Sequence, residues 1–257
     1  MMRALRSARA ACGATLLVVL LTVQAPDAFA ESNDVASNAE WRAWPEYCRA
    51  RYVAYNAGKM NPIWERQVSR ASIQKWAGII AMPMWDAMHH YCRGLVRLHR
   101  YKNVPKASAA AMQATRKYEA DAAVEEFRYV LNYKKDNPRF SPIIEASLAL
   151  ALHYSGRSTE AMYTIGQAIH DQPDIVDPYS AGYIILREAG KRDDGLELLK
   201  KCHEATKGSS AENNYFLALE YLDRKDYDNA RDYAKQAYKL GYPLQGAKRR
   251  LMAAGKW

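Results

Sequence analysis

The chain is poor in the residues that loop-rich β proteins need. Of its 257 residues, only 13 are glycine and 4 are phenylalanine, whereas 18 are tyrosine. This balance favours helices over a β-sandwich. Hydrophobic residues make up 49% and charged residues 25% of the chain, which excludes wholesale disorder and a collagen-like fibre.

Known catalytic motifs are absent as well. The sequence has no G-x-S-x-G elbow, no P-loop, no H-E-x-x-H and no C-x-x-C redox motif. The adjacent acids Glu125-Glu126 and Asp193-Asp194 diverge on a helix and therefore form no acid–base dyad. We expect a protein that is not an enzyme and needs no cofactor.

Long hydrophobic runs are missing except near the start of the chain. Residues 1–30 have the three parts of an export signal: three arginines, an apolar run at 15–23, and an A-x-A site that ends at Ala30. The apolar run is shorter than the ~20 residues of a spanning helix, which favours cleavage after Ala30 over an uncleaved anchor. We expect a periplasmic or secreted protein with no transmembrane segment once the signal is removed.

Basic residues outnumber acidic ones, and the formal net charge is +9. Removal of residues 1–30 takes away three arginines and one aspartate, so that 34 − 27 leaves +7. We expect no nucleic-acid partner for an exported protein. Its anionic neighbours would be lipid head groups, cell-wall polymers or acidic proteins, unless the charge only confers solubility.

A repeat organises the C-terminal half. Gly156, Gly190 and Lys225 are separated by 34 and 35 residues. Fixed offsets from each of them carry small or apolar residues, namely Ala161, Gly195 and Ala230, then Ile165, Leu199 and Ala234, then Ala168, Cys202 and Ala237. A unit of this length predicts a pair of helices that buries its apolar face only by stacking on its neighbours.

The segments L-A-L-A-L-H-Y-S-G-R-S-T-E-A (148–161) and L-A-L-E-Y-L-D-R-K-D-Y-D-N-A (217–230) resemble the tetratricopeptide repeat. The resemblance covers residues 142–242 and, loosely, 84–134. It implies an all-α, right-handed solenoid of about four helix–turn–helix units. The family's tryptophan is replaced here by Glu145, Tyr179 and Asn214.

The expected organisation has three parts. Residues 1–30 are the signal peptide, 31–80 are a leader and a helical cap, and 81–257 are the repeat domain with a basic C-terminal capping helix. We expect residues 31–40 to be disordered, short helices near Pro45–Tyr55 and Glu65–Ile79, and a first repeat helix over Met84–Tyr101. Gly195 is expected to mark the tightest helix crossing.

The resemblance also implies a binding surface, because the first helix of each unit lines the concave side in this family. The corresponding positions are Ser147, Leu150, Tyr154, Ser180, Ile184, Arg187, Tyr215, Phe216 and Leu219. Such an apolar and aromatic groove suits a polypeptide segment of another envelope or secreted protein. Alternatively, these residues pack against a terminal helix or a second copy of the chain.

Three cysteines follow the predicted cleavage site. Cys202 falls on a small core position of its repeat and is expected to be a buried thiol. Cys48 and Cys92 are expected to form a disulfide that clips the cap onto the first repeat helix. The alternative is a metal site that uses Cys48, Cys92, His89 and His90.

The expected helix over 84–101 also carries a basic stripe, formed by His89, Arg93, Arg97 and Arg100. It could receive an anionic ligand, or it could be a face balanced by acids elsewhere. Eight tryptophans and tyrosines lie within residues 41–85. They could form the core of the cap, or they could line a sugar- or peptide-binding face.

Three functions follow from these features. The leading hypothesis is an exported interaction scaffold that acts in envelope assembly or secretion. The second is a metal- or redox-handling protein, and the third is a glycan- or peptidoglycan-associated protein.

Overall fold

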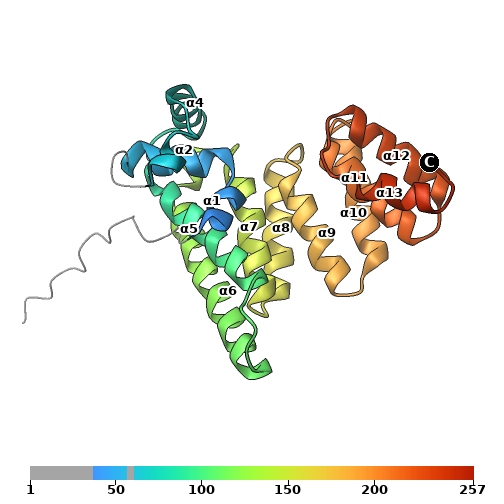
Figure 1. Ribbon diagram of the computed structural model, residues 1–257, viewed down its shortest axis with the longest axis horizontal. Helices are drawn as coiled ribbons and strands as arrows, with labels where there is room; N and C mark the ends of the chain where they lie inside the picture. Colours follow the sequence, from blue (N-terminus) through green and yellow to red (C-terminus); the bar gives the residue numbers. More distant parts are fainter. Residues whose placement is uncertain (1–36, 57–60) are drawn as a thin grey trace, which may run out of the picture. The chain divides into compact units, whose positions relative to one another are not determined.

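The computed structural model describes residues 37–56 and 61–257, which belong to one compact unit (Figure 1). This part of the chain is helical and contains no strand, as the composition predicts. Its helices are α1 (Asn38–Ala43), α2 (Glu46–Asn56), α3 (Pro62–Glu65), α4 (Arg70–Ile80), α5 (Met84–Lys102), α6 (Ala109–Leu131), α7 (Ser141–Tyr154), α8 (Ser158–Asp171), α9 (Asp177–Glu188), α10 (Arg192–Ala205), α11 (Ala211–Asp223), α12 (Tyr227–Lys239) and α13 (Gly246–Ala253). The predicted signal peptide and its cleavage site lie outside the described residues.

From α5 onward, the helices pair in chain order. The pairs α5–α6, α7–α8, α9–α10 and α11–α12 each pack together, and α13 packs against both α11 and α12 (Figure 1). Neighbouring pairs are joined by contacts of α6 with α7, of α7 with α9 and of α10 with α11. No helix in the described part of the chain is long and apolar enough to cross a membrane.

The three aligned positions of the sequence repeat adopt the same backbone conformation. Gly156, Gly190 and Lys225 have left-handed φ values of 88°, 75° and 61°. In each turn, the next residue donates its N–H to the carbonyl five residues earlier, over 2.7, 2.8 and 3.0 Å. This is the hydrogen bond that closes a helix C-terminus and turns the chain into the next helix. The repeat is therefore a repeat of local structure.

The small residues of the repeat lie where paired helices meet. Ala161 and Ala230 are fully buried, and Gly195 is buried as well. The expectation that Gly195 marks the tightest crossing is wrong. A Cβ atom at Gly195 would lie 3.2 Å from Tyr183, whereas one at Gly182 would lie 2.6 Å from Leu198 and one at Gly94 would lie 2.5 Å from Phe127. The closest approaches occur where a large side chain from the facing helix covers a glycine.

The prediction for the N-terminal region needs correction in one place. Residues Asn38–Ala43 form α1, so residues 38–40 belong to a helix and not to a disordered leader. Ser37 caps this helix by accepting the N–H of Glu40. Further along the chain, α6 begins at Ala109 after the cap Ser108.

The aromatic residues of the cap form its core. Trp41 and Trp44 are buried, and Trp64 stacks on Trp41 with ring centroids 5.2 Å apart. The indole of Trp41 donates to Gln67 over 2.8 Å. These contacts support the core interpretation of the aromatic segment.

Candidate functional site

The structure brings four of the nine predicted groove residues around one hollow of about 160 Å³. We call it the α7–α9 hollow. Its lining consists of Ile143, Ala146, Ser147 and Leu150 from α7, Asp177, Ser180, Ala181 and Ile184 from α9, and Glu212 from α11. Most of the lining is apolar, and the polar part consists of two serine hydroxyls and two carboxylates.

The predicted residues of the last unit lie elsewhere. Tyr215 is buried and stacks on Tyr242, with ring centroids 4.3 Å apart. Phe216 packs 5.3 Å from the ring of Tyr183, and the half-buried Leu219 packs against the same cluster as Tyr215. In this unit, Tyr215 therefore packs against the segment that leads into α13.

Two further predicted residues are also outside the α7–α9 hollow. Arg187 is exposed and lies 3.4 Å from the carboxylate of Asp223. Tyr154 stacks on Tyr101, with ring centroids 4.4 Å apart. Together with Arg116 and Lys117, these tyrosines line a separate, open cleft of about 850 Å³ beside the start of α6.

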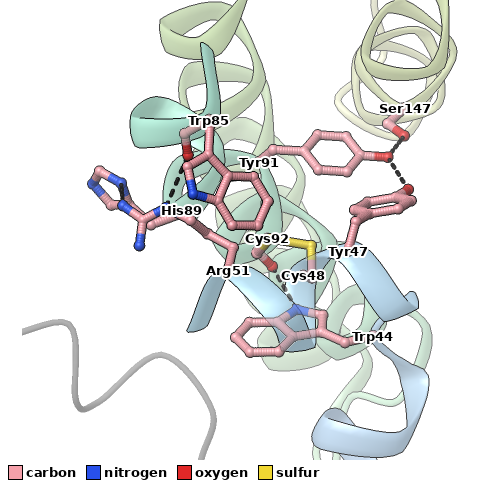
Figure 2. The surroundings of a disulfide bond; sticks show 9 residues. All are labelled: Trp44, Tyr47, Cys48, Arg51, Trp85, His89, Tyr91, Cys92 and Ser147. Carbon is pink, nitrogen blue, oxygen red and sulfur yellow. Dashed lines mark hydrogen bonds between the residues drawn. A yellow bond between two sulfur atoms is a disulfide. The ribbon is translucent and has the colours of Figure 1, made fainter. Parts of the chain in front are cut away.

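The two serines of the α7–α9 hollow differ in their hydrogen bonds. Ser147 donates to the carbonyl of Ile143 over 3.2 Å, and its Oγ lies 3.1 Å from the hydroxyl of Tyr91. The Tyr91 hydroxyl in turn lies 3.3 Å from that of Tyr47 (Figure 2). Since the Ser147 proton is used by Ile143, Tyr91 donates to Ser147 and Tyr47 donates to Tyr91. A chain of hydroxyls thus leads from the cap to the hollow.

The Ser180 side chain has no hydrogen-bond partner among the described residues. The residue is only 8% exposed, and its Oγ forms no hydrogen bond in the described part of the chain. Its interaction with the Glu212 carboxylate partly offsets the rise in the pKa of Glu212. A buried hydroxyl without a partner costs free energy unless a ligand or water satisfies it.

The two carboxylates of the hollow are in unfavourable surroundings for their charges. Burial raises the pKa of Glu212, and the charge of Asp177 raises it further. The Asp177 side chain is exposed, yet the protein around its carboxylate raises its pKa as well. Neither carboxylate forms an ion pair within the described residues. These two acids were missed from the sequence, where the only signal was an acid in the first turn of a helix next to a groove position.

In contrast to the carboxylates of the hollow, the arginines of the basic stripe on α5 pair with acids from other helices. His90 lies 2.6 Å and Arg93 lies 3.3 Å from the Glu126 carboxylate of α6. Further along α5, Arg97 lies 3.2 Å from Glu119 and Arg100 lies 2.6 Å from Glu40 of α1. The first residue of the stripe, His89, contacts the carbonyl of Asp86 over 2.8 Å. The stripe therefore connects α5 to α6 and α1.

Cys48 and Cys92 lie at disulfide-bonding distance, with sulfur atoms 2.08 Å apart, as the sequence predicts (Figure 2). The indole of Trp44 donates to the carbonyl of Cys92 over 2.7 Å, and Arg51 donates to the carbonyl of Trp85 over 2.9 Å. The described residues contain no group of three histidine, cysteine or acidic side chains that could hold a metal. Cys202 is buried, and burial raises the pKa of its thiol to about 12.

Comparisons of the chain with protein-family models and with curated proteins give no match. Arguments about function therefore rest on the residues and their geometry.

Proposed function

We propose that this protein is an exported scaffold of tetratricopeptide-like, right-handed repeats that binds another envelope or secreted polypeptide in the α7–α9 hollow. The observation that carries the proposal is the hollow itself. Positions chosen from the repeat alone (Ser147, Leu150, Ser180 and Ile184) surround one concavity.

The shape and chemistry of the hollow suit a binding role. Leu150 and Ile184 are half-buried, so that each offers apolar surface to a partner while remaining anchored in its helix. A volume of about 160 Å³ is far below the several hundred Å³ of a typical small-molecule pocket. It matches one or two side chains of a polypeptide that lies across the helices.

Two features of the N-terminal half support export. Residues 1–30 have the composition of a cleaved signal, and a disulfide between Cys48 and Cys92 is typical of an oxidising compartment. N-terminal sequencing of the protein purified from its native host tests this part of the proposal. We expect the chain to begin at Glu31, and a chain that begins at Met1 would contradict export by cleavage.

The binding role can be tested by cross-linked capture from an envelope fraction, followed by mass spectrometry. The test variant is Leu150→Ser plus Ile184→Ser. The matched control is Tyr163→Ser, because Tyr163 is a large residue of α8 that is 68% exposed and does not line the hollow. Thermal unfolding should first show that both variants fold.

We expect one polypeptide to be captured by the native protein and by the control, and lost with the test variant. Equal capture by all three proteins would contradict binding in the α7–α9 hollow.

A further inference from the structure

The α7–α9 hollow contains an unusual charge arrangement for this protein. The chain has a net charge of +9, and its buried acids are paired with the surplus cations. Glu145 lies 2.8 Å from Lys134, and Glu220 lies 3.1 Å from Arg192. Asp177, which is exposed, and Glu212, which is half-buried, both line the hollow, and no cation of the described residues pairs with either of them.

Helix dipoles account for part of this arrangement. Asp177 and Glu212 stand in the first turns of α9 and α11, where an acid interacts favourably with the helix N-terminus. The interaction with the helix N-terminus alone would lower the pKa of each carboxylate. Both pKa values are raised, because burial outweighs the dipole and, at Glu212, the neighbouring carboxylate adds repulsion.

We propose that the α7–α9 hollow binds a lysine side chain of the partner polypeptide. This inference rests on the proposed function and specifies the chemistry of the partner. The ammonium group would be held by Asp177 and Glu212, and the Ser180 hydroxyl would accept one of its hydrogen bonds. The methylene stem would lie along Leu150 and Ile184.

The lining favours lysine over arginine. An ammonium group has three donors that radiate from one nitrogen, which matches three separate acceptors on α9 and α11. A guanidinium group is planar and prefers both oxygens of a single carboxylate. The small volume of about 160 Å³ also suits an unbranched stem with a compact head.

A divalent cation is a poorer occupant. The hollow has two carboxylates, and the described residues contain no cluster of three acids, histidines or cysteines that could hold a metal. Calcium takes six to eight oxygen ligands, which two carboxylates and two hydroxyls do not supply. A negatively charged segment is excluded by repulsion from both acids.

Binding of a single side chain can be measured directly by NMR of isotope-labelled methyl groups, with Nα-acetyl-lysine amide as the probe. We expect saturable shifts of the Leu150 and Ile184 methyl signals in the millimolar range. The ε-acetylated probe has the same stem but no charge, and it should bind at least tenfold more weakly. Equal shifts with both probes, or no shift with the lysine probe, would overturn the assignment.

Two variants test the proposed acceptors, one for the two carboxylates and one for the Ser180 hydroxyl. Asp177→Asn plus Glu212→Gln should weaken binding of the lysine probe at least tenfold, and Ser180→Ala should weaken it less. The matched control is Glu125→Gln plus Asp228→Asn, which changes the net charge equally at side chains that are 73% and 85% exposed. If the control weakens binding as much as the test variant, the effect is one of net charge and the assignment fails. Shifts of the same methyl signals with calcium chloride but not with the lysine probe would also overturn it.

Capture from the envelope fraction separates this inference from the proposed function. If Asp177→Asn plus Glu212→Gln keeps the partner while Leu150→Ser plus Ile184→Ser loses it, the hollow binds a polypeptide but not its lysine. If neither variant loses the partner, the binding role itself is contradicted. Loss with both variants, together with the probe shifts, is the result that we expect.

Discussion

The α5 face and the α7–α9 hollow use charge in opposite ways. On α5, His90 and Arg93 share the carboxylate of Glu126 on α6, and we call these three residues the closed set. In the hollow, Asp177 and Glu212 have no counterpart within the described residues. The arginines of the basic stripe, which is the more conspicuous sequence pattern, pair with acids of other helices, whereas the two acids of the hollow form no ion pair in the described part of the chain.

The pKa shifts record the same contrast. Burial alone would raise the pKa of Glu126, but the His90 hydrogen bond and the Arg93 charge outweigh it and hold the pKa below its ordinary value. Burial raises the pKa of Glu212, and no cation opposes it. A carboxylate with a lowered pKa stabilises the fold when ionised, and one with a raised pKa costs stability when ionised.

The largest expected effect is loss of the disulfide that anchors the α5 face. Cys48→Ala plus Cys92→Ala should lower the free energy of unfolding by about 4 kcal/mol, because the bond closes a long loop in the unfolded chain. Denaturant unfolding of the variant measures this, and a reducing agent should produce the same loss in the native protein. Unchanged stability would mean that ion pairs and buried aromatics alone hold the cap on α5.

The next effect tests whether the α5 charges are structural. Glu126→Gln leaves His90 and Arg93 without their carboxylate and should lower the free energy of unfolding by about 2 kcal/mol. Glu125→Gln is the matched control, because the neighbouring residue is 73% exposed and forms only an i,i+3 pair with Arg128. If the two variants have equal stability, the closed set on α5 contributes nothing and the comparison with the hollow fails.

The smallest expected effect is an increase in the free energy of unfolding. Glu212→Gln removes a carboxylate whose ionisation is unfavourable, so the variant should be more stable than the native protein at pH 7. The gain should fade as the pH falls through the raised pKa of Glu212 and vanish below its ordinary value of 4.5. The loss caused by Glu126→Gln should also fade, but only as the pH falls through the lowered pKa of Glu126.

Other groups near Glu212 do not obscure this pH dependence. Asp177 of α9 titrates in the same direction, because its pKa is raised too. Burial raises the pKa values of Cys202 on α10 and of Tyr242 before α13 to about 12, so neither changes charge in this range. Thermal unfolding at several pH values measures the effect. A Glu212→Gln variant that is less stable than the native protein at pH 7 would show that the carboxylate has a partner in the fold.

The repeat shows how far sequence reasoning reaches. The turns at Gly156, Gly190 and Lys225 depend on residues within a few positions along the chain, and all three have the left-handed φ that the alignment requires. The cysteine pairing was equally accessible, since two cysteines on neighbouring predicted helices have few other partners. The start of α1 was not accessible, because propensity alone sets helix ends poorly and tertiary contacts decide them.

The binding surface shows where sequence reasoning stops. Ser147 and Ser180 were selected by their positions in the repeat, and both residues line one hollow. Position in the repeat could not show that Tyr215 would be covered by Tyr242, because that contact depends on the return of the chain before α13. Nor could it show that Arg93 meets Glu126, which lies 33 residues away on another helix.

The sequence by itself thus determined the helical class, the repeated turns and the residues available for the disulfide, because local hydrogen bonds and apolar spacing set these features. The tertiary structure decided which charges are neutralised and which hollow stays open. Charge pairing and exposure depend on contacts between helices that are distant in the chain. In this protein those contacts pair the arginines of α5 with acids and leave Asp177 and Glu212 without an ion pair among the described residues.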